Sequence, residues 1–393
     1  MTSGVTIVIP TWNGLELLER FLPSVISAAQ HYSHNSGAPT ELLIVDDDSK
    51  DNTVDWLLSK RFLCVDSNEG VRRNEQSSEG DSTLGVESKR TALIDTSNHP
   101  LPALTLLRNS CNLGFGETCN RGFRAARYPL VLLLNNDVEI ASDAIAPLVA
   151  NFTDESIFAV HCRVFDLQSG RQCGTGKLGS FARGFIRVHR SYVLANQDTG
   201  SLIGVTPRSS ANPLYSMFAG GGSAMFDRGH LLDIGGFEPL LSPFYWEDVE
   251  LSYRAWKRGL IVLFEPRSVT RHQVSSTIGK LDRHRVSRIE QRNRIVYHWI
   301  HLQDAGLLFS HLIWICILAA TAPLRLKFDF ILALIAAIKL LPRVLKRRRE
   351  ENIASLRTDR EVFEIFDAML GRSDLRVYDR YEDLAQARAS KDR

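Results

Sequence analysis

Short apolar runs alternate with longer amphipathic segments along the first third of the chain. The runs are rich in Val, Ile and Leu and are bounded by polar turn residues; they lie at 5–9, 42–45, 104–107 and 130–134. Such runs are typical of strands buried on both faces. Apolar positions recur with helical spacing between them, at 15–29, about 53–60 and around Gly122. Strands alternating with helices predict an α/β fold, a Rossmann-like sheet with helices on both faces.

The pattern is less regular after residue 150. Strands are expected at 157–164 and 260–264 and a helix at 247–257, whereas the stretch from Arg171 to Pro213 gives only weak signals. Residues 66–100 interrupt the alternation with a segment rich in Ser, Glu, Asn and Gly. Low hydrophobicity and absent periodicity indicate a mobile surface insertion, with a partner-binding element as the alternative.

A third pattern begins after residue 300. Leu307 to Leu324 is an apolar stretch of 18 residues, and the shorter stretch 328–341 contains Asp329 and Lys339. Basic residues flank the pair, including the run KRRR at 346–349. We expect a membrane-associated helical pair over 301–345 that lies in, or re-enters, one leaflet. A true span of about 20 residues and a buried or oligomer-forming helix remain alternatives.

The pattern therefore divides the chain into three parts. These are an α/β domain at 1–300, the apolar pair at 301–345 and a charged helical tail at 346–393.

Composition narrows the choice of function. The 393 residues carry a formal net charge of only +2, which gives no support for nucleic-acid binding. The six cysteines form no CxxC pair and no zinc-site spacing, and they fit a reducing compartment. The N-terminal MTSGVTIVIP has no basic region followed by a long apolar one, so no signal peptide is expected.

Candidate chemistry collects where the predicted strands end. The first strand ends in Pro10, Thr11, Trp12 and Asn13, the second in three aspartates at 46–48, and the fourth in Asn135, Asn136 and Asp137. Ligands of doubly wound sheets bind beyond the carboxyl ends of the strands. An aromatic ring next to acids suits a nucleobase, although turn formation and helix capping explain the same residues without a ligand.

Two further polar groups stand later in the chain. Glu247 and Asp248 open a predicted helix, where the helix dipole favours anions in any protein. His272 follows the last predicted strand and is read either as a ligand-binding or as an ordinary structural histidine.

Taken in order, several of these stretches resemble the family 2 glycosyltransferases of the GT-A fold. The matching pieces span about residues 5–300; they are VIPTWNG, IVDDDSKDNT, NLGFGETCNRGF, LLLNNDVEI, GGFEPLLSPFYWEDVELSYR, RHQVSST and QRNR. The chain looks most similar to the rhamnosyltransferase-like branch. The resemblance implies a mixed sheet and inverting transfer of a sugar from a nucleotide-diphosphate sugar, such as a UDP- or dTDP-sugar, to an acceptor hydroxyl.

The resemblance also assigns roles to residues. Pro10, Trp12 and Asp47 would hold the nucleoside, and Asn136 would lie beside the ribose or the diphosphate. Asn13, Asn120 and Gly221 would complete the nucleotide-sugar site. Asp137 would bind a divalent metal, Mg²⁺ or Mn²⁺, with His272 near it. Asp248 would be the catalytic base, with Glu247 near the acceptor.

Two departures from the family pattern limit the interpretation. Asn135 stands where a strict DxD motif has its first acid, which leaves one carboxylate for the metal. The QxxRW signature of processive synthases is absent, so single addition is expected, in cell-surface polysaccharide or lipid-linked glycan synthesis. Since nucleotide sugars are cytosolic, the expected location is the cytoplasmic face of the cell membrane. A catalytically silent membrane-bound relative and a nucleotidyltransferase are the alternatives. The sequence does not specify the donor sugar, the acceptor, the linkage or the oligomeric state.

Overall fold

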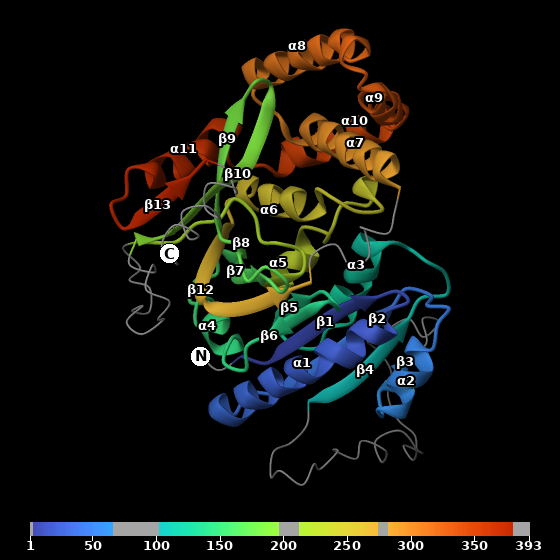
Figure 1. Ribbon diagram of the computed structural model, residues 1–393. Coiled ribbons are helices and arrows are strands. Elements are labelled where there is room, and N and C mark those ends of the chain that lie inside the picture. Colours follow the sequence, from blue (N-terminus) through green and yellow to red (C-terminus); the bar gives the residue numbers. More distant parts are fainter. Residues whose placement is uncertain (1–2, 66–101, 196–211, 274–281, 380–393) are drawn as a thin grey trace, which may run out of the picture.

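The computed structural model describes residues 3–65, 102–195, 212–273 and 282–379 (Figure 1). The predicted insertion at 66–100 lies outside the described residues, as do the last four residues of RHQVSST. Three hydrophobic clusters organise the described parts, one on each face of a large sheet and one among the helices that follow residue 283.

The large sheet is mixed, as the family resemblance implies. Its strand order is β3-β4-β2-β1-β5-β11-β7-β12-β6, with β8 paired to β7. The strands are β1 (Val5–Thr11), β2 (Thr40–Asp46), β3 (Leu63–Val65), β4 (Ala103–Arg108), β5 (Leu130–Leu134), β6 (Val138–Ile140), β7 (Ile157–Asp166), β8 (Gln172–Gly174), β11 (Ser223–Asp227) and β12 (Ile261–His272). β3, β4, β2, β1 and β5 run parallel, whereas β11 is antiparallel to both β5 and β7.

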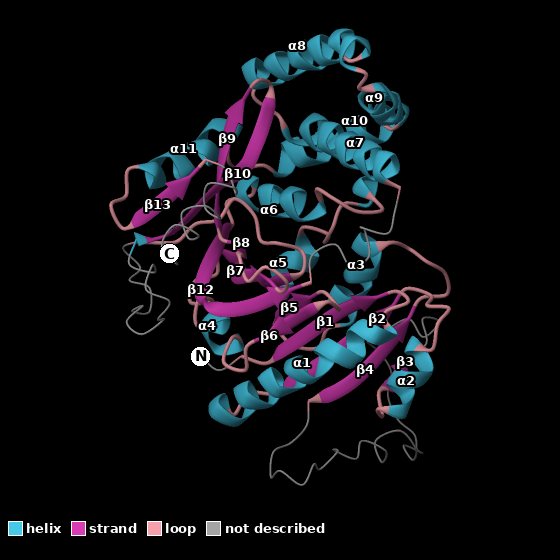
Figure 2. Cartoon of the chain, viewed as in Figure 1, coloured by secondary structure: helices cyan, strands magenta, loops and turns pink. Residues whose placement is uncertain are grey.

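Helices cover both faces of this sheet (Figure 2). Alternate residues of β1 enter opposite clusters: Ile7 and Ile9 pack with α1, and Val8 packs with α3. This is what a strand buried on both faces requires. One face carries α1 (Leu15–Ser36), α2 (Thr53–Ser59) and α4 (Ile145–Val149); the other carries α3 (Phe115–Ala125), α5 (Arg228–Asp233) and α6 (Glu247–Lys257).

A second, three-stranded sheet includes the stretch in which the local pattern is weak. β9 (Gly176–Ala182) and β10 (Phe185–Leu194) make an antiparallel hairpin, and β13 (Leu375–Tyr378) joins its edge. Because β13 comes from the end of the described chain, the third strand of this sheet is a long-range partner that local periodicity does not reveal.

The remaining helices follow one another after residue 282. They are α7 (Arg283–His301), α8 (Ala305–Thr321), α9 (Phe328–Lys339), α10 (Leu341–Ala354) and α11 (Asp359–Leu370), with the 3-10 turns η5 (Pro323–Arg325) and, earlier, η3 (Pro239–Leu241). Among the described residues, no helix combines the length and the apolarity needed to cross a membrane.

The predicted tail at 346–393 contributes to the core of the main domain. Phe366 of α11 is fully buried and contacts Trp256 of α6, with ring centroids 5.3 Å apart. Lys257 and Asp359 form a buried ion pair between the same two helices at 3.0 Å. Residues far apart in the sequence therefore share one hydrophobic cluster.

Candidate active site

The carboxyl ends of β1, β2 and β5 meet at the point where the strand order changes direction. The Asn136 side chain donates to Thr11 Oγ1 at 2.9 Å, which ties the turn after β5 to the end of β1. Asn13 donates its backbone N–H to Ser49 Oγ and accepts from Lys50 N, which ties the end of β1 to the turn after β2. Sheet pairing thus brings the three predicted polar turns together, as expected for a topological switch point.

The three residues of the predicted nucleoside site, Pro10, Trp12 and Asp47, differ in exposure. Trp12 is 46% exposed, so its ring is free to stack against a ligand, while Pro10 is buried within β1. Asp47 is only 4% exposed. Its carboxylate accepts from the Asn109 side chain and from the backbone N–H groups of Leu113 and Gly114, at 2.7–2.9 Å. Asp47 therefore shapes the loop that leads into α3.

Asp137 and His272 lie in contact. His272 is the last residue of β12, which pairs with β6 so that His272 stands opposite Val138. Its Nε2 lies 2.9 Å from Asp137 Oδ1. The next residue, Gln273, donates its N–H to the Asp137 carbonyl. The pairing of two short strand segments accordingly brings together residues 135 positions apart, as the predicted metal site requires.

A glycine loop connects this turn to Asp248. Asn135 donates its N–H to the Gly222 carbonyl at 3.1 Å, and Gly221 donates its N–H to Asp248 Oδ2 at 3.3 Å. At Gly222 a Cβ would collide with the Asn135 amide, so this close approach depends on glycine. The turn formed by Asn135, Asn136 and Asp137 is called the NND turn below. Two hydrogen bonds and the peptide unit between Gly221 and Gly222 therefore link the NND turn to Asp248, the predicted base.

The side chain of His161 binds the same loop at Gly220. Its Nδ1 accepts the Gly220 N–H at 3.2 Å, and the ring is 4% exposed on β7. Burial, reinforced by the nearby Lys177 charge, lowers the pKa of His161 to about 4. The ring is therefore neutral at pH 7 and can act as the acceptor that the Gly220 N–H needs.

Desolvation raises the pKa of both acids at the start of α6, Glu247 and Asp248. Desolvation, followed by the Asp248 charge, raises the pKa of Glu247 to about 8. Desolvation also raises the pKa of Asp248, while hydrogen bonds from the Val249 and Gly221 N–H groups oppose the shift. Glu247 Oε2 has no hydrogen-bond partner among the residues that the structure describes. We therefore assign the proton at neutral pH to Glu247 and the charge to Asp248.

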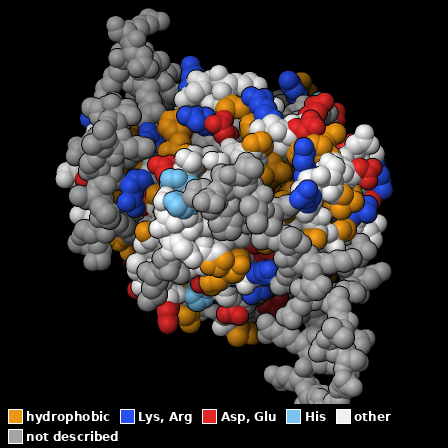
Figure 3. All heavy atoms as spheres, turned by 90° about the horizontal axis from the view of Figure 1, so that it is seen from below, with side chains coloured by type: hydrophobic (Ala, Val, Ile, Leu, Met, Phe, Trp, Pro, Cys, Tyr) orange, Lys and Arg blue, Asp and Glu red, His pale blue; other side chains and the backbone are white. Residues whose placement is uncertain are grey.

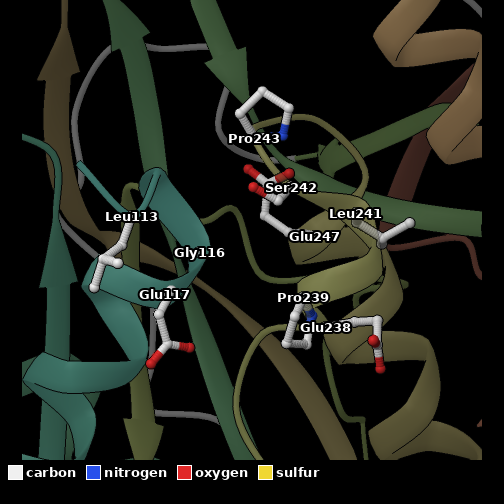
Figure 4. Close-up of a pocket in the computed structure, with 9 residues that line it drawn as sticks. All are labelled: Leu113, Gly116, Glu117, Glu238, Pro239, Leu241, Ser242, Pro243 and Glu247. Atoms are coloured by element: carbon white, nitrogen blue, oxygen red, sulfur yellow. The ribbon is translucent and has the colours of Figure 1, made fainter. Parts of the chain in front are cut away.

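Glu247 faces a cavity of about 230 Å³ between α3 and the segment before α6 (Figure 4). Leu113, Gly116 and Glu117 lie on the α3 side. The opposite side is formed by Glu238, Pro239, Leu241, Ser242 and Pro243. Glu117 and Glu238 are paired with Arg124 and Arg347 respectively. Glu247 is therefore the lining carboxyl that has a free oxygen to offer a ligand.

The segment that presents the two acids is held by α7. Tyr245 and Trp246 have φ angles of 72° and 74°, a region that costs non-glycine residues about 1–3 kcal/mol each. The buried Asn293 side chain donates to the carbonyls of Leu241, Phe244 and Tyr245. This clamp offsets the backbone strain and gives a structural reason for the QRNR stretch.

The structure gives Asn120 and Gly221 supporting positions. Asn120 is buried, and its amide both donates to the Phe237 carbonyl and accepts the Phe237 N–H. It therefore joins α3 to the loop that leads to Glu238. Gly221 contacts Asp248, the predicted base, as described above, and a Cβ there would lie 3.5 Å from Asp248 Cβ.

Sequence reasoning did not single out Asn109, His161 or the individual role of Asn293. Asn109 follows β4 as Asn135 follows β5, and a polar residue at the carboxyl end of a strand was the available signal. His161 lies inside an apolar strand, and no sequence pattern distinguishes it from an ordinary core residue.

The side chains at the predicted site decide whether a divalent metal could be bound there. Within residues 3–65, 102–195, 212–273 and 282–379, no group of three or more His, Cys, Asp and Glu side chains forms a ready-made site. Mg²⁺-type sites commonly use one or two carboxylates and complete the coordination with substrate phosphates. Asp137 would supply such a carboxylate, with His272 in contact with it, and a diphosphate would supply the remaining oxygens.

These features define a class of protein, an α/β protein whose polar turns gather at the switch point of a mixed sheet. Comparison with family models then identifies the family. The model described as "Glycosyltransferase like family 2" matches residues 83–290, which is more than half of the chain, and "Glycosyl transferase family 2" matches residues 6–73. The chain belongs to the family 2 glycosyltransferases. Comparison with curated protein sequences finds no match.

Solved structures support the fold. GalNAc-T7, solved with UDP, GalNAc and Mn²⁺, has a TM-score of 0.54 and 17% identity, and the match covers 95% of this chain and 58% of that one. The chain thus spans little more than half the length of GalNAc-T7. The mannosyltransferase PcManGT of Pyrobaculum calidifontis has 17% identity and a TM-score of 0.46 over 86% of this chain and 87% of that one. S. aureus TarS, residues 1–349, has 15% identity and a TM-score of 0.45 over 93% and 92%. The match to GalNAc-T7 supports a mixed α/β fold like that of the GT-A glycosyltransferases.

Proposed function

We propose that this glycosyltransferase carries out inverting transfer of a sugar from a UDP- or dTDP-sugar to an acceptor hydroxyl. The acceptor belongs to a cell-surface polysaccharide or a lipid-linked glycan, and rhamnose is one candidate sugar. One observation carries the proposal: Asp248, at the start of α6, is joined through Gly221 and Gly222 to the turn that contains Asp137.

The donor occupies the carboxyl ends of the parallel strands. The exposed Trp12 ring stacks on the nucleobase, and the diphosphate lies near Asn136, Asp137 and His272. A divalent metal held by Asp137 and His272 would neutralise charge on the departing nucleoside diphosphate. The UDP and Mn²⁺ in the structure of GalNAc-T7 agree with this donor class and metal.

Asp248 removes the proton from the attacking alcohol. Two backbone N–H groups hold its carboxylate in place, so it presents an ionised oxygen without rearrangement. A carboxylate positioned in this way contributes about 10²- to 10⁴-fold in rate. Attack from the side opposite the diphosphate inverts the anomeric carbon.

The acceptor enters through the cavity lined by Glu247. A protonated Glu247 donates a hydrogen bond to an acceptor oxygen and leaves the negative charge on Asp248. Since nucleotide sugars are cytosolic, catalysis takes place on the cytoplasmic face of the cell membrane.

A donor screen with Asp248→Asn tests the base. The purified chain is incubated with UDP- and dTDP-sugars and Mn²⁺, and released nucleotide diphosphate is measured. Asp248→Asn should lower turnover by about 10²-fold or more, because the amide cannot take a proton, while donor binding is retained. Near-normal turnover of the variant would refute the assignment. Asp367→Asn, an exposed change on α11, is the control.

The metal assignment is tested by calorimetry with the best donor. Asp137→Ala should abolish the Mn²⁺-dependent part of nucleotide binding, whereas the exposed Asp143→Ala should leave it intact. Identical titrations of Asp137→Ala and the wild type would contradict the assignment. Donor binding by the wild type without any release of nucleotide would instead favour a catalytically silent protein.

A further inference from the structure

Helices α8 and α9 expose large apolar side chains along continuous faces. On α8 these are Phe309, Ile313 and Ile317, spaced four residues apart and 43–67% exposed. On α9 they are Phe328, Leu332 and Ile335, 46–55% exposed. Positions separated by three, four or seven residues share one side of a helix. Each helix therefore presents an apolar stripe to its surroundings.

The turn between the helices continues this apolar surface. Leu324 and Leu326 are 86% and 79% exposed, and the basic Arg325 and Lys327 alternate with them. We refer to the exposed residues of α8, this turn and α9 as the apical surface, which forms the upper edge of Figure 1.

Charge around the apical surface has one dominant sign. Residues 305–349 contain eight Lys and Arg but a single acid, Asp329. That acid is already paired with His284, 2.7 Å away on α7. Lys339, Arg343 and Lys346 are exposed at the end of α9 and along α10. An apolar face bordered by exposed cations is complementary to a bilayer containing anionic lipids.

The inner sides of the helices are anchored, so the apolar stripes cannot simply fold inward. His311 of α8 is buried and bonds the Gly184 carbonyl at the tip of the β9–β10 hairpin at 2.7 Å. Ile315 of α8 and Ala337 of α9 are buried in one cluster with residues of α7. The face seen from below in Figure 3 differs, because apolar and charged side chains are intermixed where side chains are described.

We propose that the apical surface docks onto an anionic lipid bilayer, with α8 and α9 lying in the plane of the interface. This inference depends on the proposed function in one respect only: the proposed function determines that the protein binds the cytoplasmic side of the membrane. A second copy of the chain fits less well, because face-to-face pairing would bring the cationic rims together. The source of the acceptor follows from the docking: it is presented at the bilayer surface, consistent with a lipid-linked glycan.

A short chain of contacts connects this surface to the catalytic cavity. Arg347 of α10 pairs with Glu238, which lines the cavity, at 2.6 Å, and with Glu351 at 2.8 Å. Through Arg347, the basic run KRRR therefore contacts a residue of the cavity wall as well as contributing to the cationic rim. Docking through α8–α10 would hold the cavity at a fixed orientation to the bilayer.

Vesicle co-sedimentation of the full chain tests the proposal. Binding is measured on phosphatidylcholine vesicles with and without phosphatidylglycerol, at low and high salt. The wild type should bind the anionic vesicles, with binding weakened by salt. Phe309→Asp combined with Leu332→Asp should reduce the partition coefficient by about tenfold or more, because each change places a carboxylate in the apolar stripe. The matched control combines Leu58→Asp with Leu63→Asp, two exposed leucines on α2 and β3.

Three readings separate the outcomes. Equal partitioning of the apical variant and the wild type would overturn the proposal. So would a wild-type dimer in light scattering that becomes monomeric in the variant, since a second copy would then cover the surface. Nucleotide release measured without vesicles should be the same in both proteins. Loss of docking with intact release therefore bears on this inference alone, and absent release in both bears on the proposed function.

Discussion

At the scale of single residues, surroundings divide three neighbouring acids of α6 into different roles. Glu250 is fully buried between Arg254 and His301, each 2.8 Å away, and these partners overcome desolvation to lower its pKa to about 2. Within the part of the chain that the structure describes, Asp248 has only backbone partners, and one oxygen of Glu247 has no partner. The sequence EDVE therefore holds one structural charge and two groups that face the site.

Glu247→Gln is predicted to change the pH dependence of transfer. In the wild type, activity should fall at low pH as Asp248 takes up a proton, at a pH above the ordinary range of an aspartate because its pKa is raised. It should fall again near pH 8, where Glu247 loses the proton that it donates. A glutamine keeps an N–H donor at every pH, so the alkaline fall should disappear while the acid fall remains.

The pH profile of kcat/KM measures this effect. An alkaline limb retained by Glu247→Gln would contradict the proton assigned to Glu247. Glu117→Gln, on the opposite cavity wall, serves as the comparison, since its carboxylate is already paired with Arg124.

At the scale of elements, the site depends on how α7 fixes the entry to α6. Asn293→Ala should remove the amide's hydrogen bonds to one buried and two partly buried carbonyls, at a cost of about 1–3 kcal/mol in unfolding free energy. Because the strained residues Tyr245 and Trp246 lose their clamp, turnover should fall more than donor affinity does.

Thermal unfolding and steady-state kinetics check this prediction, with Glu290→Ala, an exposed change on the same helix, as control. Unchanged stability and turnover would show that the segment before α6 keeps its conformation without the hydrogen bonds of Asn293. Equal losses of donor affinity and turnover would place the damage elsewhere in the site.

Element prediction succeeded where a segment carries its own period. The strands at 5–9, 42–45, 104–107 and 130–134 all lie within observed strands, and the helix expected at 247–257 has those bounds. The helix expected at 15–29 extends to Ser36 despite Pro23. The β9–β10 hairpin was not predicted, since its alternation is broken by a bulge between Arg187 and Arg190.

At the scale of the whole molecule, stability is shared between the main sheet and the end of the described chain. Phe366→Ala should lower the unfolding free energy by about 3–5 kcal/mol, because a large side chain is removed from the core that α6 shares with α11. The loss should appear in the main unfolding transition, which Trp256 fluorescence reports through its contact with Phe366.

The exposed Leu370→Ala in the same helix should have little effect. A tail that folded independently would leave the main transition of Phe366→Ala unchanged. Removing residues 302–393 would also remove α11 from the core of the main domain. Point substitutions on α8 and α9 therefore test membrane docking without this disruption.

The sequence by itself determined the elements with a clear period, the polar turns that end them and the family to which the ordered motifs belong. These depend on interactions within short segments, and the strand alternation and helical spacing are visible in one dimension. It also indicated the apolar, cation-rich stretch after residue 300.

Tertiary structure alone decided which polar groups meet. The pairing of β12 with β6 puts His272 on Asp137, and the loop Gly220–Gly222 connects the NND turn to Asp248. It also decided that Asp47 and Asn120 bind distant backbone groups of the protein, at Gly114 and Phe237, while one oxygen of Glu247 has no partner among the described residues. Burial and partners depend on contacts between residues distant in the chain, and no local pattern encodes them.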